Sequence, residues 1–156
     1  MPSITNFVER IYQFNHDAGL LSRGYDDFLE SSFQVEEALE GFDLELLASQ
    51  LYPVDLPEDA GDAKFLSRHI LEMADARKIR QSDVARLDKH IDSMVFDIGA
   101  IAKLGLTTEQ MIRAINVVMD ANQAKLGCPK DEHGKLTKPA DFPNPEPRLQ
   151  AILDER

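Results

Sequence analysis

The chain has 156 residues, and its hydrophobic fraction of 43% and charged fraction of 29% are ordinary for one folded domain with a sizeable core. The formal net charge of -11 argues against binding to nucleic acid or to an anionic membrane, because both attract basic surfaces. A single cysteine excludes an internal disulfide, and without a signal peptide or a membrane-spanning apolar run we expect a cytoplasmic protein.

Helical periodicity runs through most of the chain, and no stretch shows the alternation of a strand, so we expect an all-α bundle of four or five helices. The predicted helices cover residues 4–14, 26–51, 62–79, 83–104, 107–126 and 145–155. Their candidate caps and stops are Asp26 or Asp27, Ser82, Gly105, and Thr107 or Thr108. We expect residues 1–126 to form the bundle and residues 127–156, rich in Pro and Lys, to form a tail on the same domain.

The second predicted helix carries three glutamates, Glu36, Glu37 and Glu40, within about 100° of arc. The stripe expected to face the core consists of Val35, Leu39, Phe42 and Leu46. Large apolar side chains also lie along the glutamate face, namely Leu29, Phe33, Leu44, Leu47 and Leu51. This pattern indicates a partly buried surface, where carboxylates are costly unless a cation or a basic partner neutralises them. A solvated acidic face is the alternative for the glutamates taken alone.

The fourth predicted helix repeats this arrangement with Asp88 and Asp92, one turn apart at the edge of an apolar stripe. The stripe consists of Val84, Leu87, Ile91, Met94, Val95 and Ile98. Carboxylates from two helices can converge on a hard cation, and Mg²⁺ suits oxygen ligands best, with Mn²⁺ as a substitute.

Three segments together resemble a known family, the MazG-like and phosphoribosyl-ATP pyrophosphohydrolase-like all-α nucleotide pyrophosphohydrolases. The segment "VEEALEG", residues 35–41, resembles the E-E-x-x-E half of the family signature. Residues 92–127 resemble the second half, with an aspartate, a glycine seven residues later, "LGL" and a helix ending in "ANQAKL". Residues 130–153, which include "GKLTKP", are similar to the tail of one subfamily.

The second half of the signature departs from the family pattern at one position. The family motif E-x-x-D would place a glutamate where this chain has Lys89, and Asp88 could supply the oxygen instead. A literal E-x-x-D occurs at Glu72 and Asp75, but Asp92 is favoured because the glycine and "LGL" follow it in the family register.

The resemblance implies hydrolysis of a nucleoside triphosphate to a monophosphate and pyrophosphate, with magnesium held by Glu36, Glu37, Glu40 and Asp92, and by Asp88 if it replaces the missing glutamate. One of the glutamates would take a proton from the attacking water, and the sequence leaves open which one. The substrate-binding residues implied are Asn122 and Lys125 on the phosphates, Lys135 and Lys138 closing over them from the tail, and Asn15 with Phe14 at the base. A solvated tail is the alternative for Lys135 and Lys138, and a core position is the alternative for Phe14.

We therefore expect a magnesium-dependent pyrophosphohydrolase that cleans the nucleotide pool, assembled as a homodimer or homotetramer. Two rivals stay open: a helical binding module that kept the fold and lost activity, as Lys89 suggests, or a phosphoribosyl-ATP pyrophosphohydrolase. The preferred base, the number of metal ions and the location of the site within or between protomers also stay open.

Overall fold

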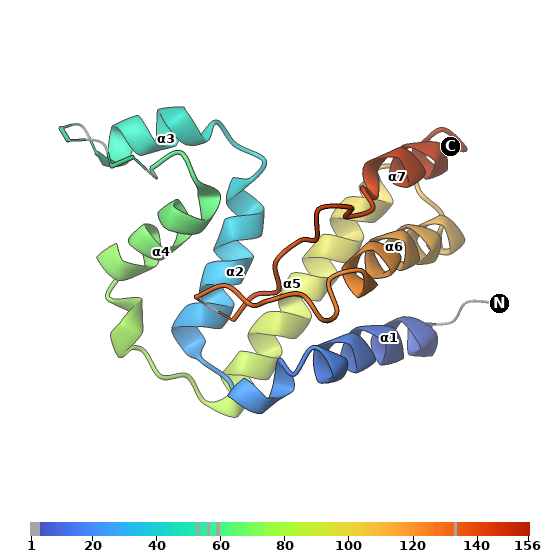
Figure 1. Cartoon of the computed structure of the whole chain (residues 1–156), viewed down its shortest axis with the longest axis horizontal. Helices are drawn as coiled ribbons and strands as arrows, with labels where there is room; N and C mark the ends of the chain where they lie inside the picture. Colours follow the sequence, from blue (N-terminus) through green and yellow to red (C-terminus); the bar gives the residue numbers. More distant parts are fainter. Residues whose placement is uncertain (1–3, 53, 56, 59, 133) are drawn as a thin grey trace. The chain divides into compact units, whose positions relative to one another are not determined.

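The computed structural model describes residues 4–52, 54–55, 57–58, 60–132 and 134–156. Over these residues the chain is all-α, as its periodicity predicts, and a single isolated bridge between Lys130 and Leu136 is the only strand-like pairing. Two short 3-10 turns, η1 (Leu21–Arg23) and η2 (Ala76–Lys78), accompany the α-helices. The α-helices in Figure 1 are α1 (Ile4–Asp17), α2 (Asp27–Leu39), α3 (Leu44–Leu51), α4 (Ala63–Met73), α5 (Asp83–Lys103), α6 (Thr108–Gln123) and α7 (Glu146–Leu153).

The chain divides into two compact units, and each is described by itself below. The larger unit comprises residues 1–24 and 87–156, and the smaller unit comprises residues 25–86. The tail from residue 127 onward thus belongs to the same unit as α1 and α6. Among the described residues, no helix combines the length and the apolar character needed to cross a membrane.

The core of the smaller unit forms where small side chains let helices approach closely. Helix α2 packs along α4 (Figure 1). Ala48, Ala60 and Leu66 are completely buried. The partly buried side chains around them are Leu39, Leu44, Leu47, Leu51, Tyr52 and Phe65. Leucines from both α2 and α3 therefore reach one apolar cluster, which explains why the sequence between 39 and 51 is so rich in leucine.

The prediction of one unbroken helix from 26 to 51 was wrong. Helix α2 ends at Leu39, and Asp43 begins α3 by accepting a hydrogen bond from the Leu46 backbone N–H at 3.0 Å. Gly41 lies in the intervening turn. Glycine destabilises a helix interior, because it loses more conformational entropy there than other residues do. The break turns α3 relative to α2, so Phe42 is 70% exposed and Leu46 is 56% exposed, although both were expected in the core.

The third predicted helix is also shorter than expected, whereas the caps were predicted correctly. Helix α4 ends at Met73, and Asp75 then adopts the left-handed conformation with φ 54° before η2. Asp26 caps α2 through the Leu29 N–H. Ser82 accepts from the Ala85 N–H at the start of α5, and Thr107 forms a capping box with Gln110 at the start of α6.

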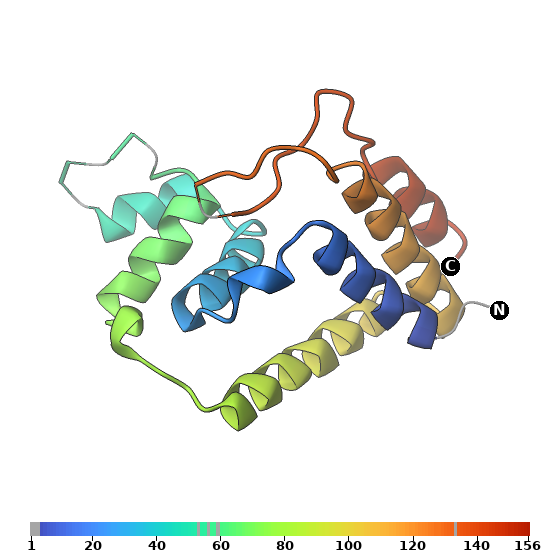
Figure 2. The same cartoon turned by 60° about the horizontal axis from the view of Figure 1, so that its bottom comes forward.

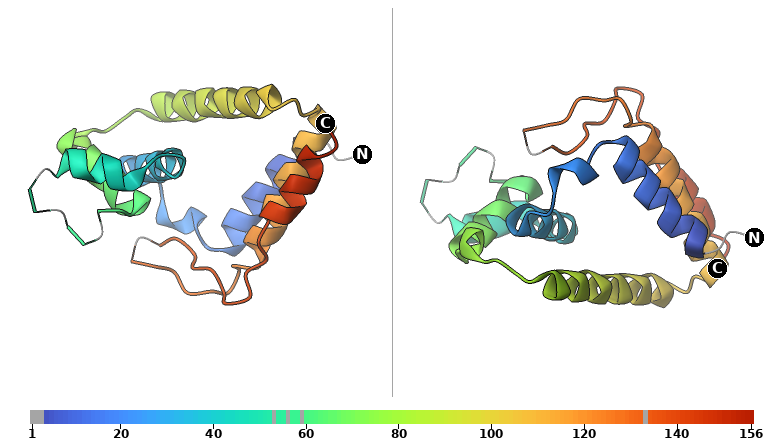
Figure 3. Two further views of the ribbon diagram at one scale, coloured as in Figure 1. Left: turned by 90° about the horizontal axis from the view of Figure 1, so that it is seen from above. Right: turned by 90° about the horizontal axis from the view of Figure 1, so that it is seen from below.

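Helix α6 is the centre of the larger unit. It lies beside α1 (Figure 2) and alongside α7 (Figure 3). Val117 of α6 is buried together with Leu106, which precedes α6, and Ile152 of α7. The partly buried residues around them are Ile101, Met111, Ala114, Leu149 and Leu153. The apolar stripe predicted for α5 does not join this core, because Val84, Leu87, Ile91, Met94, Val95 and Ile98 are each at least 40% exposed.

Asp120, on α6, ties α1 and α7 of the larger unit to its own helix. One carboxylate oxygen accepts a hydrogen bond from Arg10 on α1 at 2.7 Å, and the other accepts from Arg148 on α7 at 2.9 Å. These two guanidinium groups lower the pKa of Asp120 from its ordinary value of 3.8, and the hydrogen bond from Arg10 makes the larger contribution. The carboxylate therefore stabilises the folded unit only while it is ionised.

We expect Asp43→Ala to lower the free energy of unfolding by about 1 kcal/mol, because the first turn of α3 loses its side-chain cap. Chemical denaturation measures this change. Asp97→Ala, at an exposed position inside α5, is the matched control and should change stability little. An equal loss in both variants would contradict the capping role of Asp43.

The pH dependence of stability tests the Asp120 network. Because the folded pKa of Asp120 is depressed, its contribution is complete above about pH 4 to 5 and is lost as the pH falls through the ordinary carboxyl pKa and then the folded one. Asp120→Asn should therefore be less stable than the wild type at pH 7 and show a smaller further loss between about pH 5 and pH 3. Thermal unfolding across this range measures both effects, with Asp97→Asn as the control. Parallel pH profiles for Asp120→Asn and the wild type would exclude the network.

Candidate functional site

Glu36 lies on the buried line of α2. Phe28, Ser32 and Glu36 follow one another at four-residue spacing and are all buried, with Glu36 only 6% exposed. Glu37 and Glu40 are exposed, and Glu40 forms the C-cap of the helix. The expectation that acid enters a buried surface thus holds for Glu36 but not for Glu37 or Glu40.

Asp88 and Asp92 are exposed residues of α5 and belong to the larger unit, whereas the three glutamates belong to the smaller one. Among the described residues, no three His, Cys, Asp or Glu side chains are grouped closely enough to hold a metal ion. The chemistry of the predicted donors nevertheless suits Mg²⁺, because every one of them is a carboxylate oxygen. Their joint role as metal ligands stays a prediction.

The alternative E-x-x-D pair already binds basic side chains. Glu72 accepts a hydrogen bond from Arg77 at 2.7 Å, and Asp75 pairs with Lys78 at 3.0 Å. A metal ion would have to displace these neighbours. Both pairs are at least half exposed and therefore weak, so the preference for Asp92 and Asp88 still rests on the family register alone.

Three residues predicted to bind substrate come together at the end of α6. Lys125 donates a hydrogen bond to Asn122 at 2.7 Å, and its ammonium lies 5.2 Å from the centre of the Phe142 ring. Lys138 approaches the same ring, with its ammonium 5.3 Å from the centre. We call Asn122, Lys125, Lys138 and Phe142 the lysine cluster. Phe142 was not predicted, because no local pattern marks a loop phenylalanine as a partner of two lysines.

The fold of the tail positions Lys138. Thr137 donates to the Pro129 carbonyl through both its backbone N–H, at 3.0 Å, and its hydroxyl, at 2.9 Å. These bonds and the bridge between Lys130 and Leu136 close a turn, and Lys138 follows directly after it. Lys135, the other predicted tail lysine, lies inside the turn, where its backbone N–H donates to Asp131. Lys138 is exposed and Lys135 is half-buried, and the binding of substrate by these two lysines stays a prediction.

Asn15 takes a different position from the one expected of a base-binding residue. Its side-chain amide donates to the Ile11 carbonyl of its own helix at 2.8 Å, so this donor is already used. Asn15 and Phe14 are both half-buried near the end of α1. No contact described for Asn15 joins it to the lysine cluster, and its role at a base stays a prediction.

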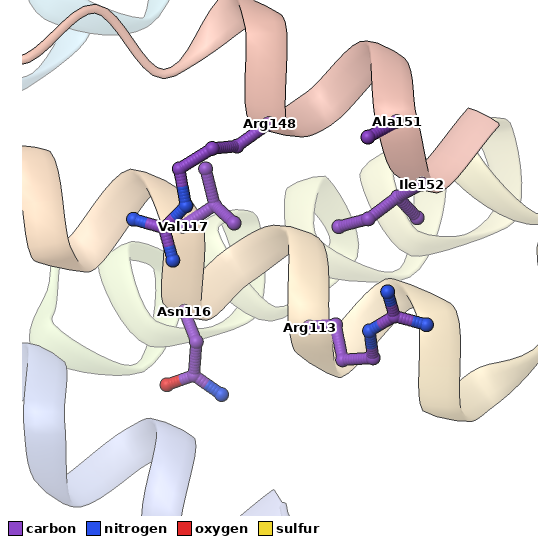
Figure 4. Close-up of a pocket in the computed structure, with 6 residues that line it drawn as sticks. All are labelled: Arg113, Asn116, Val117, Arg148, Ala151 and Ile152. Carbon is purple, nitrogen blue, oxygen red and sulfur yellow. The ribbon is translucent and has the colours of Figure 1, made fainter. Parts of the chain in front are cut away.

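The larger unit also has a pocket between α6 and α7, with a volume of about 350 Å³ (Figure 4). Its two arginines are already paired: Arg113 with Glu155 through two hydrogen bonds of 2.6 Å, and Arg148 with Asp120. The rest of the lining is Asn116, Val117, Ala151 and Ile152. None of the predicted site residues lines this pocket, so it is not the candidate site.

Comparison of the chain with family models, with curated proteins and with solved structures found no match. The likeness to nucleotide pyrophosphohydrolases therefore rests on the motifs of the sequence alone.

We expect Phe142→Leu to separate the two lysine side chains, because leucine has no ring quadrupole to attract an ammonium. In proton NMR, the methylene protons beside both ammonium groups should lose the upfield ring-current shift that a neighbouring aromatic face causes. Phe96→Leu, at a 76% exposed position of α5, is the matched control. Unchanged Lys125 and Lys138 signals in Phe142→Leu would contradict the cluster.

Proposed function

We propose that the protein is a magnesium-dependent nucleoside triphosphate pyrophosphohydrolase, which releases pyrophosphate and a nucleoside monophosphate. The observation that carries the proposal is the lysine cluster, in which two ammonium groups lie at one aromatic ring and one of them is bound by an amide oxygen. Such a grouping suits the several negative charges of a triphosphate, and it is unusual on a chain of net charge -11. The motif resemblance supplies the reaction type.

In this proposal, lysines bind the phosphates and carboxylates bind the metal. Lys125 and Lys138 would bind phosphate oxygens as point charges, and Asn122 would hold Lys125 in place. Glu36, fixed in the buried line of α2, would serve as a metal ligand together with Glu37, Glu40 and Asp92, and Asp88 would take the place left by Lys89. Bound magnesium would offset phosphate charge and acidify a water molecule. A glutamate not fully used as a ligand would take the proton of that water.

A catalytically inactive binding module of the same fold is the second candidate. Lys89 supports this candidate, because its positively charged side chain occupies the position at which the family motif has a carboxylate. A phosphoribosyl-ATP substrate is the third, since the same fold and acidic motif serve that reaction in the resembling family. We also propose a homodimer or homotetramer, which the exposed apolar side chains of α5 support.

Pyrophosphate release from a panel of ribo- and deoxynucleoside triphosphates, and from phosphoribosyl-ATP, tests the proposal. We expect release that needs magnesium and stops with a chelator. Glu36→Gln and Asp92→Asn should each lower kcat on the order of 10²-fold or more, the usual size of an acid–base or metal contribution. Lys138→Gln should raise KM roughly tenfold with a smaller effect on kcat, because it removes a charge-assisted phosphate contact.

The matched controls are Glu45→Gln, in the first turn of α3, and Asp97→Asn, in α5; both should keep full activity. Release from phosphoribosyl-ATP alone would select the third candidate. Absence of release from every substrate, together with retained magnesium-dependent nucleotide binding, would select the binding module.

A further inference from the structure

The smaller unit contains a pocket in which three arginines converge. Its volume is about 310 Å³, at the lower end of the range for small-ligand sites. The lining combines these arginines with two aromatic and two acidic residues, namely Tyr25, Asp26, Asp27, Phe28, Arg77, Arg80 and Arg86. All of them lie within residues 25–86, and none belongs to the site proposed above. We call it the arginine pocket.

Arg86 is a fixed part of the wall. Its guanidinium donates to both carboxylate oxygens of Asp27, at 2.7 and 3.2 Å, and to Asp83 at 2.8 Å. It also lies over the Tyr25 ring, 4.6 Å from the ring centre. The hydrogen bonds to Asp27 and Asp83 raise the pKa of Arg86 further above its ordinary value, so the group stays charged at every physiological pH. All three guanidinium nitrogens of Arg86 donate to carboxylates. Arg86 therefore neutralises Asp27 and is not counted as a donor to a ligand.

Arg77 and Arg80 keep donors for a ligand. Arg77 stacks on Phe28, with its guanidinium carbon 3.8 Å from the ring centre, and it donates to Glu72 through Nε and Nη2. Arg80 uses only Nη1, which donates to the Arg77 and Ile79 carbonyls. Over the described residues, Nη1 of Arg77 and both Nε and Nη2 of Arg80 have no acceptor. Arg80 also has no carboxylate partner there.

Neither acidic residue of the lining accepts a hydrogen bond from Arg77 or Arg80. Asp26 accepts the hydrogen bond that caps α2, from the Leu29 N–H at 2.9 Å, and Asp27 is bound by Arg86. The pocket between α6 and α7 differs in this respect, because there Arg113 and Arg148 are each held by a carboxylate. The arginine pocket therefore offers an anion two adjacent guanidinium groups, a combination suited to bidentate binding of tetrahedral phosphate oxygens.

We propose that the arginine pocket binds a phosphate group, either as free inorganic phosphate or as the phosphoryl group of a small phosphate monoester. Arg80 and Arg77 donate the hydrogen bonds, and Arg86 holds Asp27 away from the bound anion. The size of the pocket suits a phosphoryl group with a short substituent rather than a macromolecule. The proposal does not depend on the pyrophosphohydrolase activity, because its residues and its unit are separate from the lysine cluster.

The test uses the full chain in magnesium-free buffer, titrated with inorganic phosphate in one arm and with glycerol phosphate in the other. Proton–nitrogen NMR of the arginine Nε–H groups reports each guanidinium separately. We expect saturable shifts of the Arg77 and Arg80 signals, with Arg148 unchanged. Arg80→Gln should weaken the affinity roughly tenfold, the cost of one charge-assisted hydrogen-bonding partner, while Arg80→Lys should lose less. Arg148→Gln is the matched control and should bind as the wild type does.

The two arms identify the source of the phosphate: tighter or exclusive saturation by inorganic phosphate indicates free phosphate, and tighter or exclusive saturation by glycerol phosphate indicates a monoester site. The proposal is overturned if Arg77 and Arg80 do not shift, if sodium chloride at equal ionic strength produces the same shifts, or if Arg80→Gln binds unchanged. It is also overturned if Lys138→Gln, rather than Arg80→Gln, abolishes saturation, because phosphate would then occupy the lysine cluster. Arg80 bonds only backbone carbonyls, so its replacement should not unfold the chain.

Discussion

The smaller unit depends on one ion pair that joins its two ends. Asp27 and Arg86 lie 59 residues apart in sequence, yet their side chains meet at 2.7 Å and are 6% and 23% exposed. Removing one member of a buried pair costs about 3–5 kcal/mol, because the other charge is left without compensation. The pair fixes the first turn of α2, and the line that begins at Phe28 carries Glu36 into the interior against α4. Asp27 and Glu36 thus lie toward opposite ends of the same helix, and both are buried.

Features encoded within a few residues were predictable from the sequence. The all-α class and the caps at Asp26, Ser82 and Thr107 follow from periodicity and from side chains that reach the nearest backbone N–H groups. The break before Asp43 was missed because apolar spacing continues through it, and a cap that competes with periodicity is a weak signal by itself. Because of this break, Phe42 and Leu46 lie at the surface and not in the core, where they were expected.

The candidate site was predictable only in part, for the same reason. Asn122 and Lys125 are one helical turn apart, so their contact is local, and Lys138 was chosen from the resemblance of the tail. The Phe142 ring lies near both lysines, although Lys125 and Lys138 are 13 residues apart in sequence (138 − 125). The turn that brings them together depends on bonds from Thr137 to the Pro129 carbonyl, which no helical or strand pattern predicts. The arginine pocket was not predicted either, because Phe28 stands 49 residues before Arg77 (77 − 28) and Tyr25 stands 61 residues before Arg86 (86 − 25), the arginines that stack on them.

Paramagnetic broadening tests most directly whether α2 and its C-cap supply the metal ligands. A stepwise titration with Mn²⁺, followed by proton–nitrogen NMR, should first broaden the backbone signals of Glu36, Glu37 and Glu40. Excess Mg²⁺ should restore them, and Glu36→Gln should require more Mn²⁺ for the same effect. Broadening that begins instead at Glu45 and Asp97, or that spreads evenly over the acidic surface, would contradict a metal site on α2 and with it the proposed chemistry.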